Sequence, residues 1–595
     1  MTIVKDVIYP APRQIEVFKT SVDLTDRRWV VLPSGCSRSL RERIQDGAKR
    51  LGPYVNRELE ISPVVPHAGG LFVELILVKR GIPDQGYRLA FTNETRRIEA
   101  SSEAGLLYGY QALAQWIETY RSKPIAFAIE DAPDFSVRGV MLDVSRCKVP
   151  TMATCKHLID HLAGLRINQI QLYIEHTFAF SAHPIVWADS SPFTHAEILE
   201  LDQYCKDRFI ELVPNLNSFG HVERYLRHPE YRYLAECPDM ENCSTLAPNQ
   251  TSLRFLKELY DEYLPNFSSS LFNVGCDETY ELGKGRSKKR ADQMGTTAVY
   301  LEFLKKIHKL VLKRGRRMQF WGDIILHQPE LITQLPKDLI ALNWGYEANH
   351  PFDKQCPAFA EAGVDFYVCP GTSAWCSITG RTDNCLANLE NAARNGQKHG
   401  ASGYLITDWG DGGHYQVLPI SYLGFAAGAG YSWSLASNRD ADLASVISRH
   451  FFADQTRGLG QFILDLGRTP NRISGIQRGN QSAIHRLLFC LHQPKDLAKV
   501  SSVQFTRAHA WLDKLASGVV EAQPRCRDRD LVMHEFQHTL DMARYALDRG
   551  CAVKAGKADT RQLQLRRGAL RESHQEQWLA RNRLGGLRES STYLL

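Results

Sequence analysis

The sequence predicts a (β/α)8 TIM barrel, flanked by an N-terminal α+β domain and an α-helical C-terminal region. Three observations lead to this fold class. Eight short apolar runs with strand character recur between residues 138 and 411, and segments with helical spacing separate them. Strand-like runs then disappear after about residue 439. Strands that alternate with helices are typical of a parallel sheet, and eight such units close into a barrel.

The first part of the chain, residues 1–134, mixes strand and helix patterns. Residues 71–81 and 86–100 are rich in β-forming side chains, and turn residues separate the two runs. In residues 103–117 the apolar side chains are spaced for one face of a helix. We therefore expect a small α+β domain, which residues 131–139 connect to the first barrel strand.

The central part, residues 135–438, is predicted to form the barrel. Its strand-like runs cover residues 138–146, 169–178, 210–221, 271–278, 318–325, 339–346, 365–371 and 403–411. Helical spacing appears between them, for example in residues 154–166 and 296–315. A doubly wound open sheet is the alternative fold. The absence of a GxGxxG sequence after an early strand favours the barrel.

The last part, residues 439–595, shows helical patterns in residues 442–452, 504–519 and 530–547. Residues 574–591 read HQEQWLARNRLGGLRESS. We expect a helix with a glycine C-cap there, followed by a tail that docks onto the barrel. A wall of the substrate cleft, or a contact in a homodimer, remains the alternative for this segment.

Length and composition exclude several classes of protein. A chain of 595 residues is long enough for two to four domains, and its net charge of +6 gives no argument for a nucleic-acid partner. No window approaches the ~18 apolar residues that a membrane span needs. The first residues lack the apolar core of a signal peptide, and the fourteen cysteines are scattered. We therefore expect a cytoplasmic protein with cysteines as small core residues.

Charged and aromatic residues stand together at the predicted strand ends, where the active site of a barrel lies. They are Asp143, Arg146, Glu175, His176, His221, Asp277, Glu278, Trp321, Asp323, Trp344, Tyr346, Trp375, Trp409 and Asp411. Each alone is compatible with a structural role, but a core does not accept so many charges. Flat rings that pack on C–H faces, beside groups that bind hydroxyls, are typical of a sugar site.

We expect no metal and no cofactor at these strand ends. They contain no HxH or HExxH spacing, and His176 with His221 makes too small a set of metal ligands.

The acids Asp277 and Glu278 are adjacent in the sequence, which restricts the chemistry that they can perform. Neighbouring residues in a strand point to opposite faces, so the pair is poorly placed to act as acid and nucleophile across one bond. It suits a substrate that supplies its own 2-acetamido nucleophile.

The quoted segments resemble glycoside hydrolase family 20, the β-N-acetylhexosaminidases. The resemblance covers the N-terminal domain, with its GLLYGYQALAQ helix, and the barrel, with RGVMLDVSR, NSFGH, NVGCDE, FWGD, NWGY and TDWGD. It implies that Asp277 orients the acetamido nitrogen and that Glu278 is the general acid and base. It also implies that Arg146 binds hydroxyls of the terminal sugar and that His221 supports the acidic pair.

The resemblance further implies an aromatic pocket made by Trp321, Trp344 and Trp409, with Asp411 at the outer hydroxyls. Tyr346 is the candidate for steadying the acetamido carbonyl, and Trp375 is part of the pocket wall. Two departures suggest a divergent subgroup. Asn273 and Cys276 replace a histidine and a glycine, and the second strand reads YIEHTF instead of an Asp-rich run. Glu175 and His176 in that strand are further candidates for binding substrate.

The expected function is an exo-β-N-acetylhexosaminidase that removes terminal β-linked GlcNAc or GalNAc from a glycan with retention. One alternative is a carbohydrate-binding barrel that has lost catalysis. The other is a different barrel hydrolase, either a β-glucosidase or a metal-dependent amidohydrolase. The preference between the two sugars and the natural linkage stay open at this point.

Overall fold

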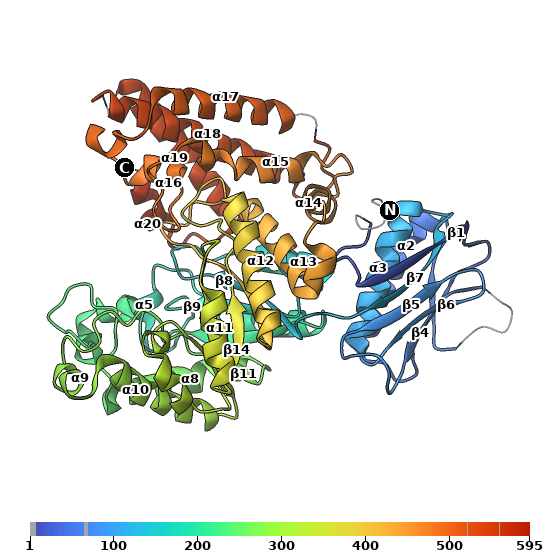
Figure 1. The fold of residues 1–595 in the computed structure, drawn as a ribbon, viewed down its shortest axis with the longest axis horizontal. Helices are drawn as coiled ribbons and strands as arrows, with labels where there is room; N and C mark the ends of the chain where they lie inside the picture. Colours follow the sequence, from blue (N-terminus) through green and yellow to red (C-terminus); the bar gives the residue numbers. More distant parts are fainter. Residues whose placement is uncertain (1–6, 65–69, 520–521, 558–559, 595) are drawn as a thin grey trace.

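The computed structural model describes residues 7–64, 70–519, 522–557 and 560–594. Figure 1 shows a sheet with helices at one end of the molecule, and the barrel with the C-terminal helices beside it at the other. The three parts follow the order of the chain, as the sequence predicts. The exact boundaries, 134/135 and 438/439, stay predictions.

The N-terminal part is a seven-stranded sheet in the order β1-β7-β5-β6-β4-β2-β3. Its strands are β1 (Gln14–Ser21), β2 (Trp29–Val31), β3 (Glu60–Ser62), β4 (Leu71–Leu77), β5 (Tyr87–Phe91), β6 (Arg96–Ala100) and β7 (Ile125–Asp131). The helices α2 (Arg38–Val55) and α3 (Glu103–Tyr120) share its hydrophobic core. The prediction of one strand over residues 86–100 is wrong. That run folds into the β5–β6 hairpin, because Thr92 N donates to Thr95 O and closes a turn.

The central part is a closed barrel of eight parallel strands, and the predicted fold class is confirmed. The strands are β8 (Val137–Asp143), β9 (Gln169–Ile174), β10 (Glu211–Leu216), β11 (Leu271–Asn273), β12 (Arg317–Trp321), β13 (Ile340–Trp344), β14 (Asp365–Cys369) and β15 (Gly403–Asp408). Six of the eight lie within the predicted runs, and β8 and β12 each begin one residue before theirs. Apart from short helices, the connections carry α4 (Met152–Gly164), α6 (His195–Lys206), α8 (Gln250–Tyr263), α10 (Thr296–Leu312), α11 (Phe352–Glu361), α12 (Thr382–Lys398) and α13 (Tyr422–Asn438).

Helices make up the C-terminal part, as predicted. They are α14 (Leu443–Phe452), α15 (Gly458–Leu466), α16 (Ala483–Phe489), α17 (Ser502–Val519), α18 (Arg529–Lys554), α19 (Arg561–Arg581) and α20 (Leu587–Ser591). Most of their buried hydrophobic side chains belong to the same cluster as the outer side of the barrel, while Trp578 and Leu587 pack with Cys147 in a small cluster of their own. The apolar faces of these helices therefore pack against the barrel and against one another.

The end of the chain docks onto the barrel, but not through a glycine C-cap. α19 ends at Arg581, and its C-cap residue Asn582 has an extended backbone with φ of −126°. The following residues then run along the first strand-end loop, where Arg583 N donates to Val149 O at 2.8 Å. Gly586, with φ +77°, passes so close to this loop that a Cβ atom would lie 1.8 Å from Cys147 O. Glycine is therefore needed at 586 for close approach, not to end a helix.

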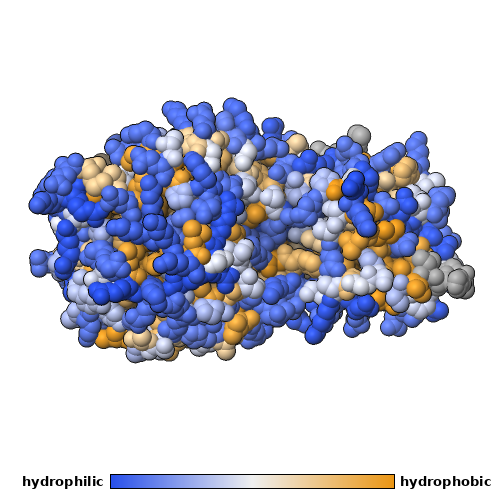
Figure 2. All heavy atoms as spheres, turned by 90° about the horizontal axis from the view of Figure 1, so that it is seen from below, coloured by the Kyte–Doolittle hydropathy of each residue, from blue (hydrophilic) through white to orange (hydrophobic). Residues whose placement is uncertain are grey.

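The surface of the molecule is mainly hydrophilic on the face that Figure 2 shows, and hydrophobic side chains gather there in smaller areas. Within the described ranges, the helices are too short or too polar to cross a membrane. All fourteen cysteines lie in these ranges, and none of them forms a disulfide. Cys276 and Cys369 are fully buried, as expected for small core residues.

A buried ion pair joins the N-terminal sheet to the barrel. Arg166, which follows α4, contacts the carboxylate of Asp131 at 3.1 Å, and both side chains are fully buried. Trp433 in α13 donates its indole N–H to the same carboxylate and presents its ring to the guanidinium, 4.5 Å from the ring centre. Three segments that are distant in the sequence therefore meet at one pair of opposite charges.

We expect Arg166→Met to lower the free energy of unfolding by about 3–5 kcal/mol, because it leaves the carboxylate of Asp131 buried without its partner. Urea unfolding followed by circular dichroism measures the change. Arg38→Met is the matched control, since Arg38 pairs with Glu42 on an exposed helix face. If the two variants unfold at the same urea concentration, the buried pair does not hold the junction.

Candidate active site

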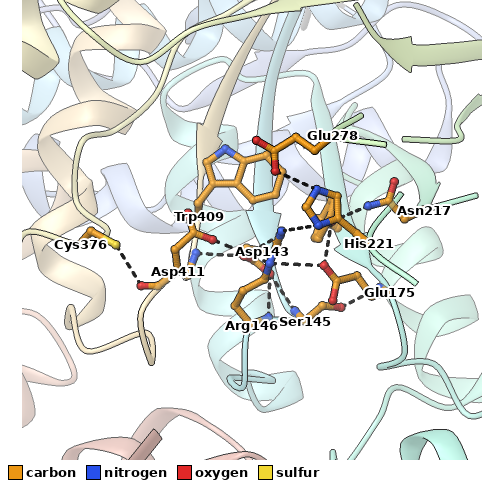
Figure 3. Close-up of polar contacts among 12 residues, drawn as sticks. Asp143, Ser145, Arg146, Glu175, Asn217, His221, Glu278, Cys376, Trp409 and Asp411 are labelled. Atoms are coloured by element: carbon orange, nitrogen blue, oxygen red, sulfur yellow. Dashed lines mark hydrogen bonds and ion pairs between the residues drawn. The ribbon is translucent and has the colours of Figure 1, made fainter. Parts of the chain in front are cut away.

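Arg146 is the centre of a network of charges at the ends of the first barrel strands (Figure 3). Its guanidinium lies 3.3 Å from Asp143 Oδ2, 3.3 Å from Glu175 Oε1 and 3.8 Å from Asp411 Oδ1. The ring of Tyr173 lies beneath it, with 4.6 Å between the guanidinium carbon and the ring centre. The arginine is thus fixed on several sides, while 20% of its side chain stays exposed toward the mouth of the barrel.

Asp143 holds the loop that carries this arginine. Its Oδ1 accepts hydrogen bonds from the backbone N–H groups of Ser145 and Arg146, at 2.9 and 3.0 Å. Its Oδ2 accepts from the N–H of Gly410, which follows the last strand of the barrel. The loop after β8 is therefore tied to its own strand and to β15. Ser145 in turn accepts a hydrogen bond from Glu175 N at 2.8 Å.

His221 bridges the two adjacent acids. Its Nε2 lies 3.3 Å from Asp277 Oδ2 and 3.3 Å from Glu278 Oε2, and its Nδ1 lies 3.5 Å from Arg146 Nη2. Burial alone would lower the pKa of His221, but the charge of Asp277 and hydrogen bonds to both acids raise it well above its ordinary value. The histidine therefore balances the charge of the pair and fixes their separation.

Two glycines allow the loops that hold this trio to approach each other. A Cβ atom at Gly220, just before His221, would lie 2.1 Å from Asp277 O. One at Gly275 would lie 1.6 Å from Asn217 Oδ1, which instead accepts a hydrogen bond from Cys276 N at 3.2 Å. Cys276 and Glu278 both take the left-handed backbone region, with φ of +71° and +47°. Such conformations are costly and typical of functional sites.

Aromatic rings form a wall beside the acids. Trp321 and Trp409 lie 6.0 Å apart, Tyr346 stacks on Trp344 at 5.0 Å, and Trp375 meets Tyr346 edge-on at 5.1 Å, all between ring centres. Trp409 donates its indole N–H to the hydroxyl of Tyr346 at 2.8 Å. Because this hydroxyl accepts from Trp409, its own proton remains available to a ligand.

Asp277 and Asp323 lie close enough for the charge of one to act on the other. Asp277 Oδ1 is buried and has no hydrogen-bond partner among the described residues. Asp323, which follows β12, accepts from Glu278 N at 3.3 Å through Oδ2. Burial and the nearby charge of Asp277 raise the pKa of Asp323. A buried carboxylate oxygen without a donor is costly, so Asp277 Oδ1 is poised for a donor that a ligand supplies.

The structure brings most of the predicted site residues together. Arg146, Glu175, His221, Asp277, Glu278, Trp321, Trp344, Tyr346, Trp375, Trp409 and Asp411 lie at this mouth of the barrel. His176 does not join them. It lines a separate cavity beneath the C-terminal tail, because it follows Glu175 and its side chain points the other way.

Four residues that support the site were given no role from the sequence: Asp143 and Asp323 were named only among the charged strand-end residues, and Tyr173 and Asn217 were not named. Asp143 and Asp323 stand at strand ends, but nothing in the pattern distinguished them from the other acids there. Tyr173 donates its hydroxyl to Glu175 Oε1 at 2.9 Å, and it lies within a wholly buried strand. Asn217 contacts the hydroxyl of Tyr173 and the loop of the acidic pair. The signal in the sequence that could have identified these residues was a polar side chain within an apolar run.

One trio of side chains in the described ranges has ligand atoms close enough for a metal ion: Glu175, His221 and Glu223. The guanidinium of Arg146 lies against two of the three, at 3.3 and 3.5 Å. A positive group is thus already placed among the ligand atoms. The charge of Arg146 opposes a cation there, and this trio does not fit a metal centre.

Two family models match this chain, one over the barrel and one over the N-terminal part. The model of the glycosyl hydrolase family 20 catalytic domain matches residues 135–396, and the model of domain 2 of the same family matches residues 6–132. The chain belongs to glycoside hydrolase family 20. The sequence resemblance that predicted this family is confirmed.

Characterised relatives of this family 20 chain are distant. It is 24% identical over 325 residues to the lacto-N-biosidase of Bifidobacterium bifidum, covering 52% of this chain and 28% of that protein. It is 26% identical over 330 residues to β-hexosaminidase subunit A1 of Dictyostelium discoideum, covering 49% of this chain and 62% of the relative. The matches thus span less than two thirds of these relatives' lengths.

Two solved structures show the same fold at low identity. The chitobiase of Flavobacterium johnsoniae is 17% identical, with a TM-score of 0.64 over 100% of both chains. The exo-β-N-acetylglucosaminidase of Vibrio harveyi, solved with N-acetylglucosamine, is 17% identical, with a TM-score of 0.60 over 78% of this chain and 77% of that one. At this identity the likeness concerns the fold.

Glu175 gives a test of the site's electrostatics. Burial raises the pKa of Glu175 to about 7, above its ordinary 4.5, although Arg146 opposes the rise. A raised carboxyl pKa stabilises the fold below pH 4.5, and this contribution is lost as the pH rises toward 7. We therefore expect Glu175→Gln to remove a decrease of about 3 kcal/mol in the free energy of unfolding between pH 4.5 and 7.5.

Urea unfolding at a series of pH values measures this difference. Glu572→Gln is the control, because Glu572 is exposed on α19. Equal pH dependence of wild type and Glu175→Gln would show that the fold does not raise the pKa of Glu175.

Proposed function

We propose that this family 20 chain is an exo-β-N-acetylhexosaminidase, which removes terminal β-linked GlcNAc or GalNAc with retention by a substrate-assisted mechanism. The observation that carries the proposal is the unpartnered, buried Oδ1 of Asp277 beside the aromatic wall. A 2-acetamido group supplies what this place lacks. Its N–H satisfies the carboxylate, and its methyl group packs on the rings.

Asp277 acts on the nucleophile that the substrate brings. By accepting a hydrogen bond from the acetamido N–H, it turns the acetamido carbonyl oxygen toward the anomeric carbon. As that oxygen bonds to the carbon, positive charge develops on the acetamido group, and the carboxylate balances it. Tyr346 donates its hydroxyl proton to the same carbonyl oxygen. The aromatic wall restricts the group to this orientation, which lowers the entropic cost of ring closure.

Glu278 transfers the proton. Burial raises its pKa, but hydrogen bonds to His221 and Tyr280 lower it more, so the pKa of Glu278 in the free protein lies below its ordinary value. One third of this side chain is exposed. A bound sugar covers it and displaces water, which favours the protonated form. Glu278 then protonates the leaving oxygen, and afterwards takes a proton from the water that opens the cyclic intermediate.

Arg146, Glu175 and Asp411 hold the other side of the sugar. A guanidinium and two carboxylates provide donors and acceptors for neighbouring hydroxyls, and the exposed fractions of Arg146 and Asp411 face the mouth of the barrel. Because this end is charged and closed by side chains, a single terminal sugar fits it better than the interior of a glycan chain.

The cytoplasmic location of the protein stays a prediction.

Hydrolysis of three chromogenic glycosides tests the proposed function: the β-N-acetylglucosaminide, the β-N-acetylgalactosaminide and the plain β-glucoside. We expect cleavage of the two N-acetylated compounds alone, because only they carry the nucleophile. Their ratio gives the sugar preference. Equal cleavage of the β-glucoside would contradict the mechanism, and binding of an oxazoline-like inhibitor without any cleavage would indicate a barrel that has lost catalysis.

We expect Glu278→Gln to lower kcat about 10²–10⁴-fold with a poor leaving group, since the amide cannot protonate the departing oxygen. The loss should shrink with a nitrophenolate, which leaves without a proton. Steady-state kinetics on both substrates measures this difference. An equal loss on both would contradict the acid role of Glu278.

We expect Asp277→Asn to lower kcat about 10²–10³-fold on every N-acetylated substrate, because the cyclic intermediate loses its counter-charge. Asp239→Asn, an exposed aspartate outside the site, is the control and should keep wild-type kinetics. Near wild-type activity of Asp277→Asn would exclude the substrate-assisted mechanism.

A further inference from the structure

A second cavity, of about 960 Å³, lies beside the barrel mouth between the strand-end loops and the last residues of the chain. We call it the loop–tail cavity. Its walls include Cys147, His176, Arg224 and Arg227 from the loops, and Arg571 and Arg588 from the C-terminal part. None of these residues has a role in the proposed mechanism.

The loop–tail cavity lies on the outer side of the loops that carry the sugar site. Cys147 follows Arg146, His176 follows Glu175, and Arg224 lies three residues after His221. Within the first two pairs, one side chain belongs to the sugar site and its neighbour lines the cavity. The cavity therefore adjoins the sugar site along these loops.

The tail that closes the cavity is held in a defined position. Arg224 Nη2 contacts Glu589 Oε1 at 2.6 Å, and Tyr415 donates its hydroxyl to Ser590 O at 2.6 Å. Gly585 packs so closely against the loop before α6 that a Cβ atom would lie 2.1 Å from the carbonyl carbon of Ser190. These contacts hold the arginines of the strand-end loops and those of the C-terminal part around the same cavity.

Positive charge dominates the lining. Arg224, Arg227, Arg571 and Arg588 face two acids, Asp189 and Glu589. Arg224 pairs with Glu589, whereas the described part of the chain offers no ion pair to Arg227, Arg571 or Arg588. A planar guanidinium binds carboxylate, sulfate and phosphate groups through two parallel N–H donors. The lining thus has donors and charge for an anion.

His176 points to a ligand independently of the arginines. It is 6% exposed, and its Nδ1 is buried without a partner among the described residues. Burial, and then the charges of Arg224 and Arg227, lower its pKa well below the ordinary value, so the imidazole is neutral. An unpaired polar atom on a neutral ring in a cavity costs free energy, which a hydrogen bond to a ligand recovers.

We propose that the loop–tail cavity binds an anionic group, a carboxylate, sulfate or phosphate, that belongs to the glycan whose terminal sugar occupies the adjacent site. The anion binding stands on the cavity itself. Its assignment to the glycan rests on the proposed function, because only then does the rest of a glycan leave the barrel mouth, beside which the cavity lies. A free inorganic anion is the other source of the same chemistry, and the experiments below separate the two.

Calorimetric titration of the full-length protein with sodium sulfate, at low ionic strength, tests the anion site. We expect Arg227→Gln and Arg571→Gln each to lower the association constant about tenfold, since each removes a charged hydrogen bond. Arg561→Gln is the matched control, because Arg561 is exposed on α19, the helix of Arg571, and lies outside the cavity. The anion site would be overturned if wild type does not bind sulfate, or if the Arg227→Gln/Arg571→Gln double variant binds sulfate as tightly as wild type.

Two trisaccharides identify the source of the anion: one of three N-acetylglucosamines, and one in which a uronic acid follows the terminal N-acetylglucosamine. If the anion belongs to the glycan, wild type should have a several-fold higher kcat/KM on the acidic compound, and the Arg227→Gln/Arg571→Gln double variant should lose this preference. Equal kcat/KM on both, with sulfate binding intact, would overturn the assignment to the glycan. If neither is cleaved while sulfate still binds, the proposed function fails and the anion site stands.

Discussion

The closure of the barrel between β15 and β8 is the constraint on which the sugar site depends. Asp408 pairs with Leu142 in this register, so the loop after the last strand meets the loop after the first. Gly410 N can then donate to Asp143 Oδ2 at 3.0 Å across 267 residues of sequence. Only in a closed ring do Arg146 and Asp411 face each other, so the site forms together with the fold.

Charges at this mouth of the barrel hold one another in place. Burying a lone guanidinium would cost several kcal/mol, but Arg146 has carboxylates at 3.3 Å on two sides and the ring of Tyr173 beneath it. Satisfied groups therefore surround the sugar site, whereas Asp277 Oδ1 and the indole N–H groups of Trp321 and Trp344 have no hydrogen-bond partner among the residues that the structure describes. Since the fold itself fixes these groups, a ligand binds to donors and acceptors that are already oriented.

The sequence predicted the parts of this protein that follow from periodic patterns. Eight apolar runs became eight strands, because each is long enough to cross the barrel and ends in polar residues. Side-chain direction at the strand ends was less predictable. Glu175 and His176 looked equivalent in sequence, yet one faces the sugar site and the other the loop–tail cavity. Asn217 and Gly275 escaped selection because their contact joins two different loops, a tertiary relation that no local pattern carries.

The strand-end loops therefore have two chemical faces. Their inner residues, such as Arg146 and Glu175, are constrained by one another and, in the proposed function, by a sugar of fixed shape. Their outer residues, such as His176 and Arg227, line the loop–tail cavity. Substitutions on the outer face can change which ligand the chain prefers without disturbing the acidic pair. The docked tail also shapes this outer face, because Glu589, which lies outside the barrel, pairs with Arg224 and sets its position. Ligand preference and catalysis can then vary independently within one fold.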